Sequence, residues 1–167
     1  MTSAVVVHVP EAEPVVGEWR RAHTYDAPLG MPAHVTILYP FVSRAEVAEA
    51  EPRLAKLVAG HEAFDATFAR TARFPGVLYL EPAPAERFLR LTGAIAAAWP
   101  EHPPYEGAHE TVIPHLTVAE ANDASLLDSI AAKVEPQLPI RERVVAASLF
   151  VEHDDGRWHE RRRLPLD

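Results

Sequence analysis

The chain has 167 residues, of which 48% are hydrophobic, so it suits one domain or two small lobes with a shared core, and general disorder is excluded. Sixteen Lys and Arg against 24 Asp and Glu give a net charge of −8, which opposes a broad electrostatic grip on long duplex nucleic acid. The absence of cysteine excludes disulfides, thiolate metal sites and thiol nucleophiles.

The first half of the chain reads as a strand and helix, a second strand and helix, and a hairpin. Ser43, followed three residues later by Glu46, matches a capping box and marks the start of the second helix. Pro75 and Gly76 mark the turn of the hairpin. In chain order, these elements are expected at residues 4–9, 11–23, 34–37, 43–59, 64–73 and 77–80.

The second half repeats much of this order. Asn122 or Asp123 can cap its second helix, and Asp154, Asp155 and Gly156 give the turn signal of a final hairpin. Two helices are expected, at residues 87–99 and around an apolar stripe at residues 126–134. Three strands are expected, at residues 115–118, 144–152 and 157–164.

The apolar run at residues 4–7 bears on localisation. It is too short for a signal peptide or a membrane span and it lacks a basic flank. We therefore expect an untargeted, soluble protein of the cytoplasm that has no membrane partner.

One short pattern occurs in both halves. The two copies are His-Val-Thr-Ile at residues 34–37, introduced by Pro32, and His-Leu-Thr-Val at residues 115–118, introduced by Pro114. Alternate residues of a strand point to one face, so each His shares a face with its Thr, and the apolar residues point to the other face. The histidines lie 81 positions apart (115 − 34), and Gly76 and Gly156 of the two turns lie 80 apart (156 − 76). This near-constant offset indicates an internal duplication.

The duplication predicts an α+β, bilobal fold with two pseudo-symmetric lobes, each with an antiparallel-rich sheet and flanking helices, and a cleft between the sheets. The approximate repeat halves are residues 1–82 and 83–167 of a single domain. If each half brings its His and Thr to the cleft, two imidazoles meet over one ligand. Such a pair suits general acid–base catalysis, and the hydroxyls can donate to an anionic oxygen. A phosphodiester meets both requirements.

At these residues the sequence resembles the two-histidine (2H) phosphoesterase superfamily, in the branch of 2′-5′ RNA ligase-like proteins and 2′,3′-cyclic phosphodiesterases. The similarity covers nearly the whole chain. Its clearest segments are residues 34–41, 73–80, 103–107 and 114–119. The resemblance implies a bilobal α+β fold, a metal-independent reaction without a cofactor, and nucleotide or RNA-terminal phosphoesters as substrates. It implies that His34 and His115 are catalytic and that Thr36 and Thr117 bind the phosphate, but it does not fix the substrate.

Further residues are candidates for substrate binding. Phe74, Tyr79 and Tyr105 could stack on a base, because they fall at a turn, in a returning strand and in a Pro-rich loop near the expected cleft. Tyr79 equally suits a core position. Arg73 is a candidate for a positive charge beside the phosphate. Its competitors for that role are Arg70, Arg157 and the arginines at 161–163.

Three functions remain open at this point. The first is hydrolysis or reversible transfer of a phosphodiester, most simply a 2′,3′-cyclic phosphate. The second is a non-catalytic nucleotide or RNA-end binding module, and the third is 2′-5′ RNA ligase activity. Paired histidines favour an enzyme, because a pure binder holds phosphate better with Arg or Lys.

A metal site is the main chemical rival to this interpretation. His102, His109 and His115 lie seven and six positions apart, outside the short spacings of zinc ligands. We therefore expect no metal and no cofactor. We also expect a monomer.

Overall fold

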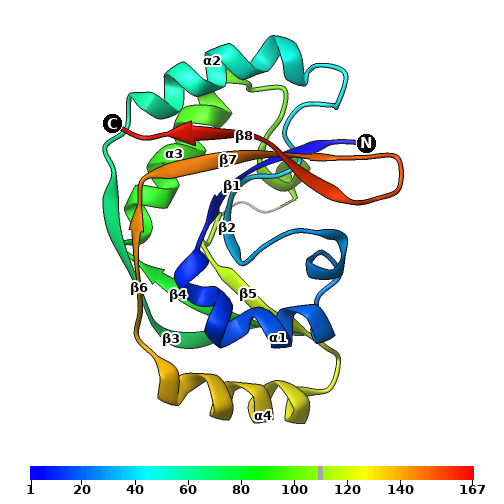
Figure 1. The fold of residues 1–167 in the computed structure, drawn as a ribbon, viewed down its shortest axis with the longest axis vertical. Coiled ribbons are helices and arrows are strands. Elements are labelled where there is room, and N and C mark those ends of the chain that lie inside the picture. The colour runs from blue at the N-terminus through cyan, green and yellow to red at the C-terminus, as the bar shows by residue number, and fades with distance from the viewer. Residues whose placement is uncertain (109–110) are drawn as a thin grey trace.

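The structure, a computed structural model, describes residues 1–108 and 111–167 and contains two four-stranded antiparallel sheets (Figure 1). Sheet A has the strand order β2-β1-β7-β8, and sheet B has the order β5-β4-β3-β6. The strands of sheet A are β1 (Ser3–His8), β2 (His34–Leu38), β7 (Ala146–Glu152) and β8 (Trp158–Pro165). Those of sheet B are β3 (Phe64–Phe74), β4 (Val77–Ala83), β5 (Leu116–Glu120) and β6 (Ile140–Val144). The predicted α+β, bilobal architecture is confirmed.

Two helices pack on each sheet. Helices α2 (Val47–Ala59) and α3 (Ala85–Ala98) contact β8 and β2 of sheet A, whereas α1 (Glu13–His23) and α4 (Ala124–Val134) contact β5 and β4 of sheet B. Figure 1 shows α2 at one end of the molecule and α4 at the other, with the sheets between them. The helix between β1 and β2 therefore covers the opposite lobe, and so does the helix between β4 and β5.

The two lobes are interleaved in sequence. The order β-α-β-α-β occurs from β1 to β3 and again, with the added strand β6, from β4 to β7. The last strand of the first copy, β3, pairs in sheet B with β4 of the second copy. The last strand of the second copy, β7, pairs in sheet A with β1 of the first copy. The halves 1–82 and 83–167 are therefore not the two lobes, because each half supplies strands to both sheets.

The local elements follow the expected order, with two differences. Helix α2 begins at Val47, because residues 43–46 form a separate turn in which the Ser43 backbone N–H donates to the Glu46 carboxylate. The strand expected at residues 144–152 is β7, which begins at Ala146 and pairs with β1 in sheet A. The strand before it, β6, was not expected and pairs with β3 in sheet B. The chain therefore changes lobe at Val145, which an apolar pattern cannot reveal.

The alternation of β1 divides its side chains between two apolar clusters. Val5 and Val7 belong to the main core, while Ala4 and Val6 belong to a small second cluster. The other members of that second cluster are Met31 and Phe150, with Trp158 packed against it. Val6 lies opposite Thr36 in the pairing of β1 with β2, so the small cluster shares the face of sheet A that carries Thr36.

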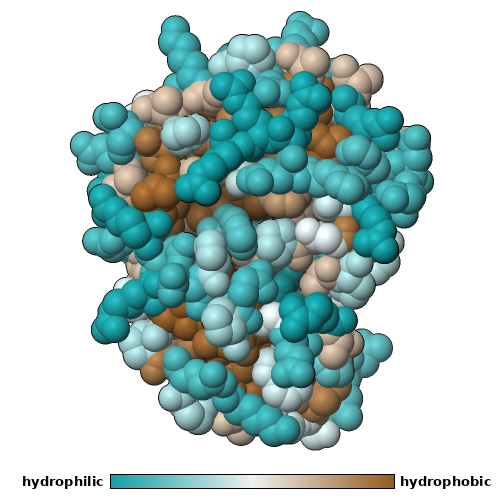
Figure 2. All heavy atoms as spheres, in the orientation of Figure 1, coloured by the Kyte–Doolittle hydropathy of each residue, from teal (hydrophilic) through white to brown (hydrophobic). Residues whose placement is uncertain are grey.

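Hydrophilic residues cover most of the face seen in Figure 2, and apolar residues are visible in patches between them. Within residues 1–108 and 111–167, no helix is both long enough and apolar enough to cross a membrane.

Candidate active site

One cleft brings together the four side chains of the two His-x-Thr patterns. His34 and Thr36 come from β2, an edge strand of sheet A. Thr117 lies in β5, an edge strand of sheet B, and His115 directly precedes this strand. The cleft has a volume of about 380 Å³. Its other lining residues are Ala4, Val6, Tyr25, Asp26, Met31, Tyr39, Tyr105, Glu120, Glu152 and Trp158.

Both histidines are held by the same kind of hydrogen bond. Nδ1 of His34 lies 2.7 Å from the Pro32 carbonyl oxygen, and Nδ1 of His115 lies 2.7 Å from the Ile113 carbonyl oxygen. A carbonyl oxygen only accepts, so Nδ1 carries the hydrogen in both rings. In the neutral ring Nε2 therefore keeps its lone pair, so it can accept a proton or, once protonated, donate one.

The two imidazoles differ in their electrostatic surroundings. Burial, together with the positive charges of Arg20 and His115, lowers the pKa of His34 to about 4, against the opposing effect of the Asp26 carboxylate. Burial also lowers the pKa of His115, which the bond to the Ile113 carbonyl opposes. A neighbouring cation thus favours the neutral form of His34 specifically.

That cation, Arg20 of α1, was not among the residues expected at the site. Its side chain is 1% exposed, and its guanidinium donates to the Thr117 carbonyl (2.7 Å) and the Asp26 carboxylate (3.0 Å). It also donates to the carbonyls of Met31 and Pro32, both at 3.3 Å. Arg20 therefore ties the loop before β2 to strand β5 of the other lobe. The only signal in the sequence was its position four residues after Val16, on the buried side of the helix.

Each His-x-Thr strand contains a β-bulge directly after its Thr. Ile37 of β2 has no partner in the register with β1, and Val118 of β5 has none in the register with β4, so these two residues are the extra residues of the bulges. A bulge adds one residue and inverts the alternation of side chains. Tyr39 and Glu120, each three positions after the Thr, consequently line the cleft. Strict alternation would have placed both on the opposite face, which is why the sequence did not indicate them.

Side chains from the helices satisfy carbonyl groups at these bulges. Arg20 of α1 donates to the Thr117 carbonyl, and the buried Thr92 hydroxyl of α3 donates to the Ile37 carbonyl at 2.7 Å. A buried carbonyl without a partner is costly, so these bonds stabilise the irregular strands that shape the cleft.

Phe74 and Tyr79 surround the ring of His115. The ring centroids of Phe74 and Tyr79 lie 5.1 Å and 5.5 Å from that of His115, and their own centroids are 4.3 Å apart. Tyr79 is only 7% exposed, so it packs against His115 and offers little free face. Phe74 borders an adjoining apolar hollow that also contacts His115 and Ile113.

The structure places Tyr105 in the cleft and Arg73 outside it. The Tyr105 and Thr36 hydroxyls are hydrogen-bonded to each other, while burial raises the pKa of Tyr105. Arg73 precedes Phe74 in β3 and so points to the opposite face, where its guanidinium lies 2.7 Å from the Asp128 carboxylate. The structure therefore does not bring Arg73 to the phosphate side of the sheet.

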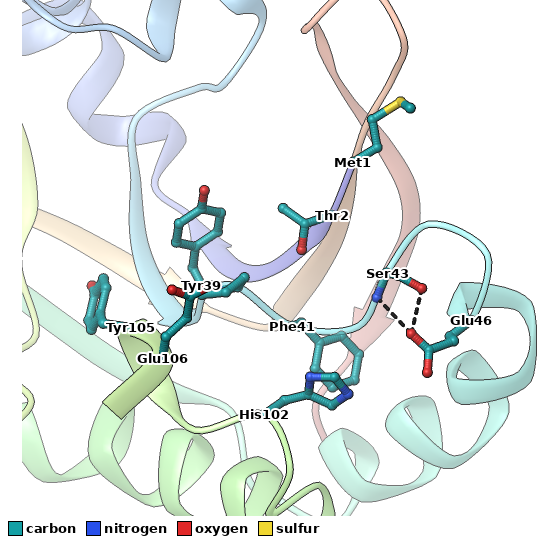
Figure 3. A pocket seen from close by; sticks show the side chains of 10 residues that line it. Met1, Thr2, Tyr39, Phe41, Ser43, Glu46, His102, Tyr105 and Glu106 are labelled. Atoms are coloured by element: carbon teal, nitrogen blue, oxygen red, sulfur yellow. Dashed lines mark hydrogen bonds between the residues drawn. The ribbon is translucent and has the colours of Figure 1, made fainter. Parts of the chain in front are cut away.

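A second, open hollow of about 530 Å³ adjoins the cleft and shares Tyr39 and Tyr105 with it (Figure 3). In Figure 3, Tyr39 and Tyr105 stand at one side of this hollow, with Ser43, Glu46 and His102 at the other. Tyr105 is fixed to the end of β2, because its backbone N–H donates to the Tyr39 carbonyl at 2.7 Å. The cleft and the hollow therefore meet at these two tyrosines.

The described residues contain no group of three or more His, Cys, Asp or Glu arranged to hold a metal ion. His109, considered above as a metal ligand, lies outside the described residues.

The fold and the cleft define a class of protein, namely a two-lobed α+β protein with one His and one Thr from each lobe. The sequence matches the 2′-5′ RNA ligase superfamily over residues 8–156, so the chain belongs to this superfamily of 2H phosphoesterases. The suspected relationship is confirmed. A comparison with curated protein sequences gave no match.

Solved structures share the fold over almost the whole chain. Escherichia coli LigT complexed with 3′-AMP has 17% sequence identity and a TM-score of 0.69, and the match covers 99% of this chain and 97% of LigT. The LigT complex with ATP is equally similar, with 17% identity, a TM-score of 0.68 and the same coverage. TT0787 of Thermus thermophilus has 21% identity, a TM-score of 0.65 and coverage of 99% and 97%.

Proposed function

We propose that this protein hydrolyses a nucleotide or RNA-terminal phosphodiester, and that a 2′,3′-cyclic phosphate is its substrate. The observation that carries the proposal is the matched pair of imidazoles in one cleft, each with Nδ1 bonded to a backbone carbonyl and each with a Thr on its face. The nucleotides in the LigT complexes, 3′-AMP and ATP, support a nucleotide as ligand.

In the proposed reaction His34 is the general base and His115 the general acid. The Arg20 charge favours neutral His34, so its Nε2 accepts a proton from water as the water oxygen attacks phosphorus. The bond between phosphorus and one ribose oxygen breaks, and protonated His115 donates its Nε2 proton to that oxygen. The product is a nucleoside monophosphate, and the histidines then exchange protons with solvent. Thr36 and Thr117 donate to the non-bridging oxygens, with Tyr105 beside Thr36.

The direct test is a panel of nucleoside 2′,3′-cyclic phosphates and short 2′-5′ oligonucleotides. We expect conversion of the cyclic phosphate to a single monophosphate isomer, identified by ³¹P NMR. Saturable binding without turnover would contradict the proposal and favour the binding module, whereas joining of RNA ends would favour the ligase.

Hydrolysis should survive removal of metal ions. The proposed acid and base are both imidazoles, so no step requires a metal-bound water. We expect unchanged kcat with EDTA and no gain from added Mg²⁺ or Mn²⁺. Loss of activity in EDTA that a divalent ion restores would contradict this prediction.

The pH profile of kcat/KM should be bell-shaped with its maximum on the acidic side of neutrality. The base must be neutral, and the pKa of His34 is lowered to about 4, so activity falls as the pH drops through that region. The acid must be protonated, and the pKa of His115 is lowered from 6.5, so activity falls as the pH rises through a value below 6.5. A profile that peaks above neutral pH would contradict this assignment.

Thr36→Val and Thr117→Val should each lower kcat/KM about 10²–10³-fold, or about 2–4 kcal/mol, because each removes a donor to a charged oxygen in the transition state. Valine keeps the shape of threonine and its preference for a strand. Thr67→Val, in β3 outside the cleft, is the matched control and should leave kcat/KM within about twofold. Equal activity of all three variants would exclude the proposed phosphate contacts.

A further inference from the structure

We propose that the cleft selects phosphodiesters with a single negative charge and discriminates against substrates that carry further phosphates. This inference rests on the proposed function and narrows its substrate class. It implies that a nucleoside 2′,3′-cyclic phosphate is a better substrate than the same group at the end of a phosphorylated or longer RNA fragment.

Carboxylates line the cleft from both lobes. Asp26 and Glu152 stand on the side of sheet A, and Glu120 reaches the cleft from β5 because of the bulge at Val118. Among the described residues that line the cleft there is no Lys or Arg, and no described ion pair neutralises Glu120 or Glu152. Two of the three carboxylates therefore have no ion-pair partner among the described residues.

Arg20 and Arg73 cannot serve a second phosphate, and Arg157, which is exposed next to Trp158 in the β7–β8 hairpin, is not among the described lining residues of either hollow. Arg20 is buried, and its guanidinium is used by the Asp26 carboxylate and three backbone carbonyls. Arg73 is paired with Asp128 on the other face of sheet B. A phosphate in the cleft is consequently held by neutral hydroxyls and by one protonated histidine, which balance one negative charge and no more.

A longer ligand meets carboxylates in either direction out of the cleft. On sheet A, Ala4 and Val6 line the cleft beside Thr36, and Trp158 and Glu152 line the same cleft from the β7–β8 hairpin. The other direction passes Tyr39 into the hollow of Figure 3. Its titratable lining side chains other than tyrosine are Glu46, Glu106 and His102, Met1 also lines it, and among the described residues that line it there is no Lys or Arg. An additional phosphate that stays in the cleft is therefore placed near Glu120 or Glu152, and this like charge disfavours binding.

The test compares adenosine 2′,3′-cyclic phosphate with the same compound carrying a 5′-phosphate, at about 20 mM and about 300 mM NaCl. We expect kcat/KM to be about tenfold or more higher for the compound without the 5′-phosphate at low salt. At high salt, exposed charges are screened, so the ratio of the two kcat/KM values should fall to about threefold. A dinucleotide that ends in a 2′,3′-cyclic phosphate should behave like the 5′-phosphorylated compound.

Charge-neutral variants identify the cause. Glu120→Gln and Glu152→Gln, which keep side-chain size, should each raise kcat/KM for the 5′-phosphorylated compound about threefold relative to the other compound. Glu86→Gln, an exposed change at the start of α3, should leave the ratio unchanged and controls for net charge. Equal or faster turnover of the 5′-phosphorylated compound by the parent protein would overturn the charge selection and leave the hydrolysis intact. Failure to turn over either compound would overturn the proposed function, and this inference with it.

Discussion

Replacement of His34 or His115 with Ala should lower kcat/KM for a 2′,3′-cyclic phosphate by about 10³-fold or more, because each removes one of the two proton transfers in the transition state. The loss should appear mainly as a lower kcat and less as a higher KM, because the Thr hydroxyls still bind the phosphate. Steady-state kinetics at the pH optimum of the parent protein give both parameters.

Two further variants separate catalysis from folding. His34→Gln retains a polar side chain at a position that is 9% exposed, so it limits any cavity, yet it cannot act as a base. It should be as inactive as His34→Ala and should unfold close to the parent temperature. His153→Ala removes an exposed histidine of the β7–β8 hairpin and should keep full activity. Recovery of activity in His34→Gln would point to a structural role for His34.

Arg20→Met should lower the free energy of unfolding by about 3–5 kcal/mol. The change keeps much of the volume but leaves the carbonyls of Thr117 and Met31 without the Arg20 donor, while the Pro32 carbonyl keeps only the bond from His34 Nδ1. Arg20→Lys should recover only part of the loss, because one ammonium group cannot reproduce the planar fork of five donors. Urea unfolding followed by circular dichroism gives the midpoint and the slope needed for the comparison.

An exposed helical arginine provides the control for this experiment. Arg90→Met on α3 should change the free energy of unfolding by no more than about 0.5 kcal/mol. In folded Arg20→Lys, the positive charge remains near His34, so the acidic limb of kcat/KM should stay close to that of the parent. In Arg20→Met that charge is absent, so the acidic limb should move to higher pH. A midpoint for Arg20→Met equal to that of Arg90→Met would show that the contacts across the lobes add no stability.

Local patterns in the sequence were sufficient for the class of fold and for the order of its α-helices and of its strands except β6. Alternation, turn residues and the cap at Asp123, which accepts from the Ser125 backbone N–H, all act over a few residues. The interleaving of the lobes was not accessible in this way. It depends on pairings such as β1 with β7, which join distant parts of the chain and leave no mark on the periodicity of either strand.

The same distinction explains what was found at the cleft. The His-x-Thr patterns are visible because alternation places both side chains on one face, and the structure brings the four residues together. Tyr39 and Glu120 were missed because a bulge breaks that alternation. Arg20 was missed because its partner Thr117 is 97 positions away, and in the sequence it is simply a charged residue of an amphipathic helix. The catalytic roles assigned to the histidines remain a prediction.

The most direct test of the central claim, that two histidines act as one acid–base unit on one phosphodiester, is a double-mutant cycle. The measurement is kcat/KM of the parent, His34→Ala, His115→Ala and the double variant with one cyclic substrate. A concerted pair predicts that the double variant is little worse than the more damaged single variant, because either loss already removes the joint proton transfer. If the fold losses in kcat/KM of the two single variants multiplied in the double variant, the two-histidine mechanism would be contradicted. A folded single variant with near-parental kcat/KM would contradict it as well.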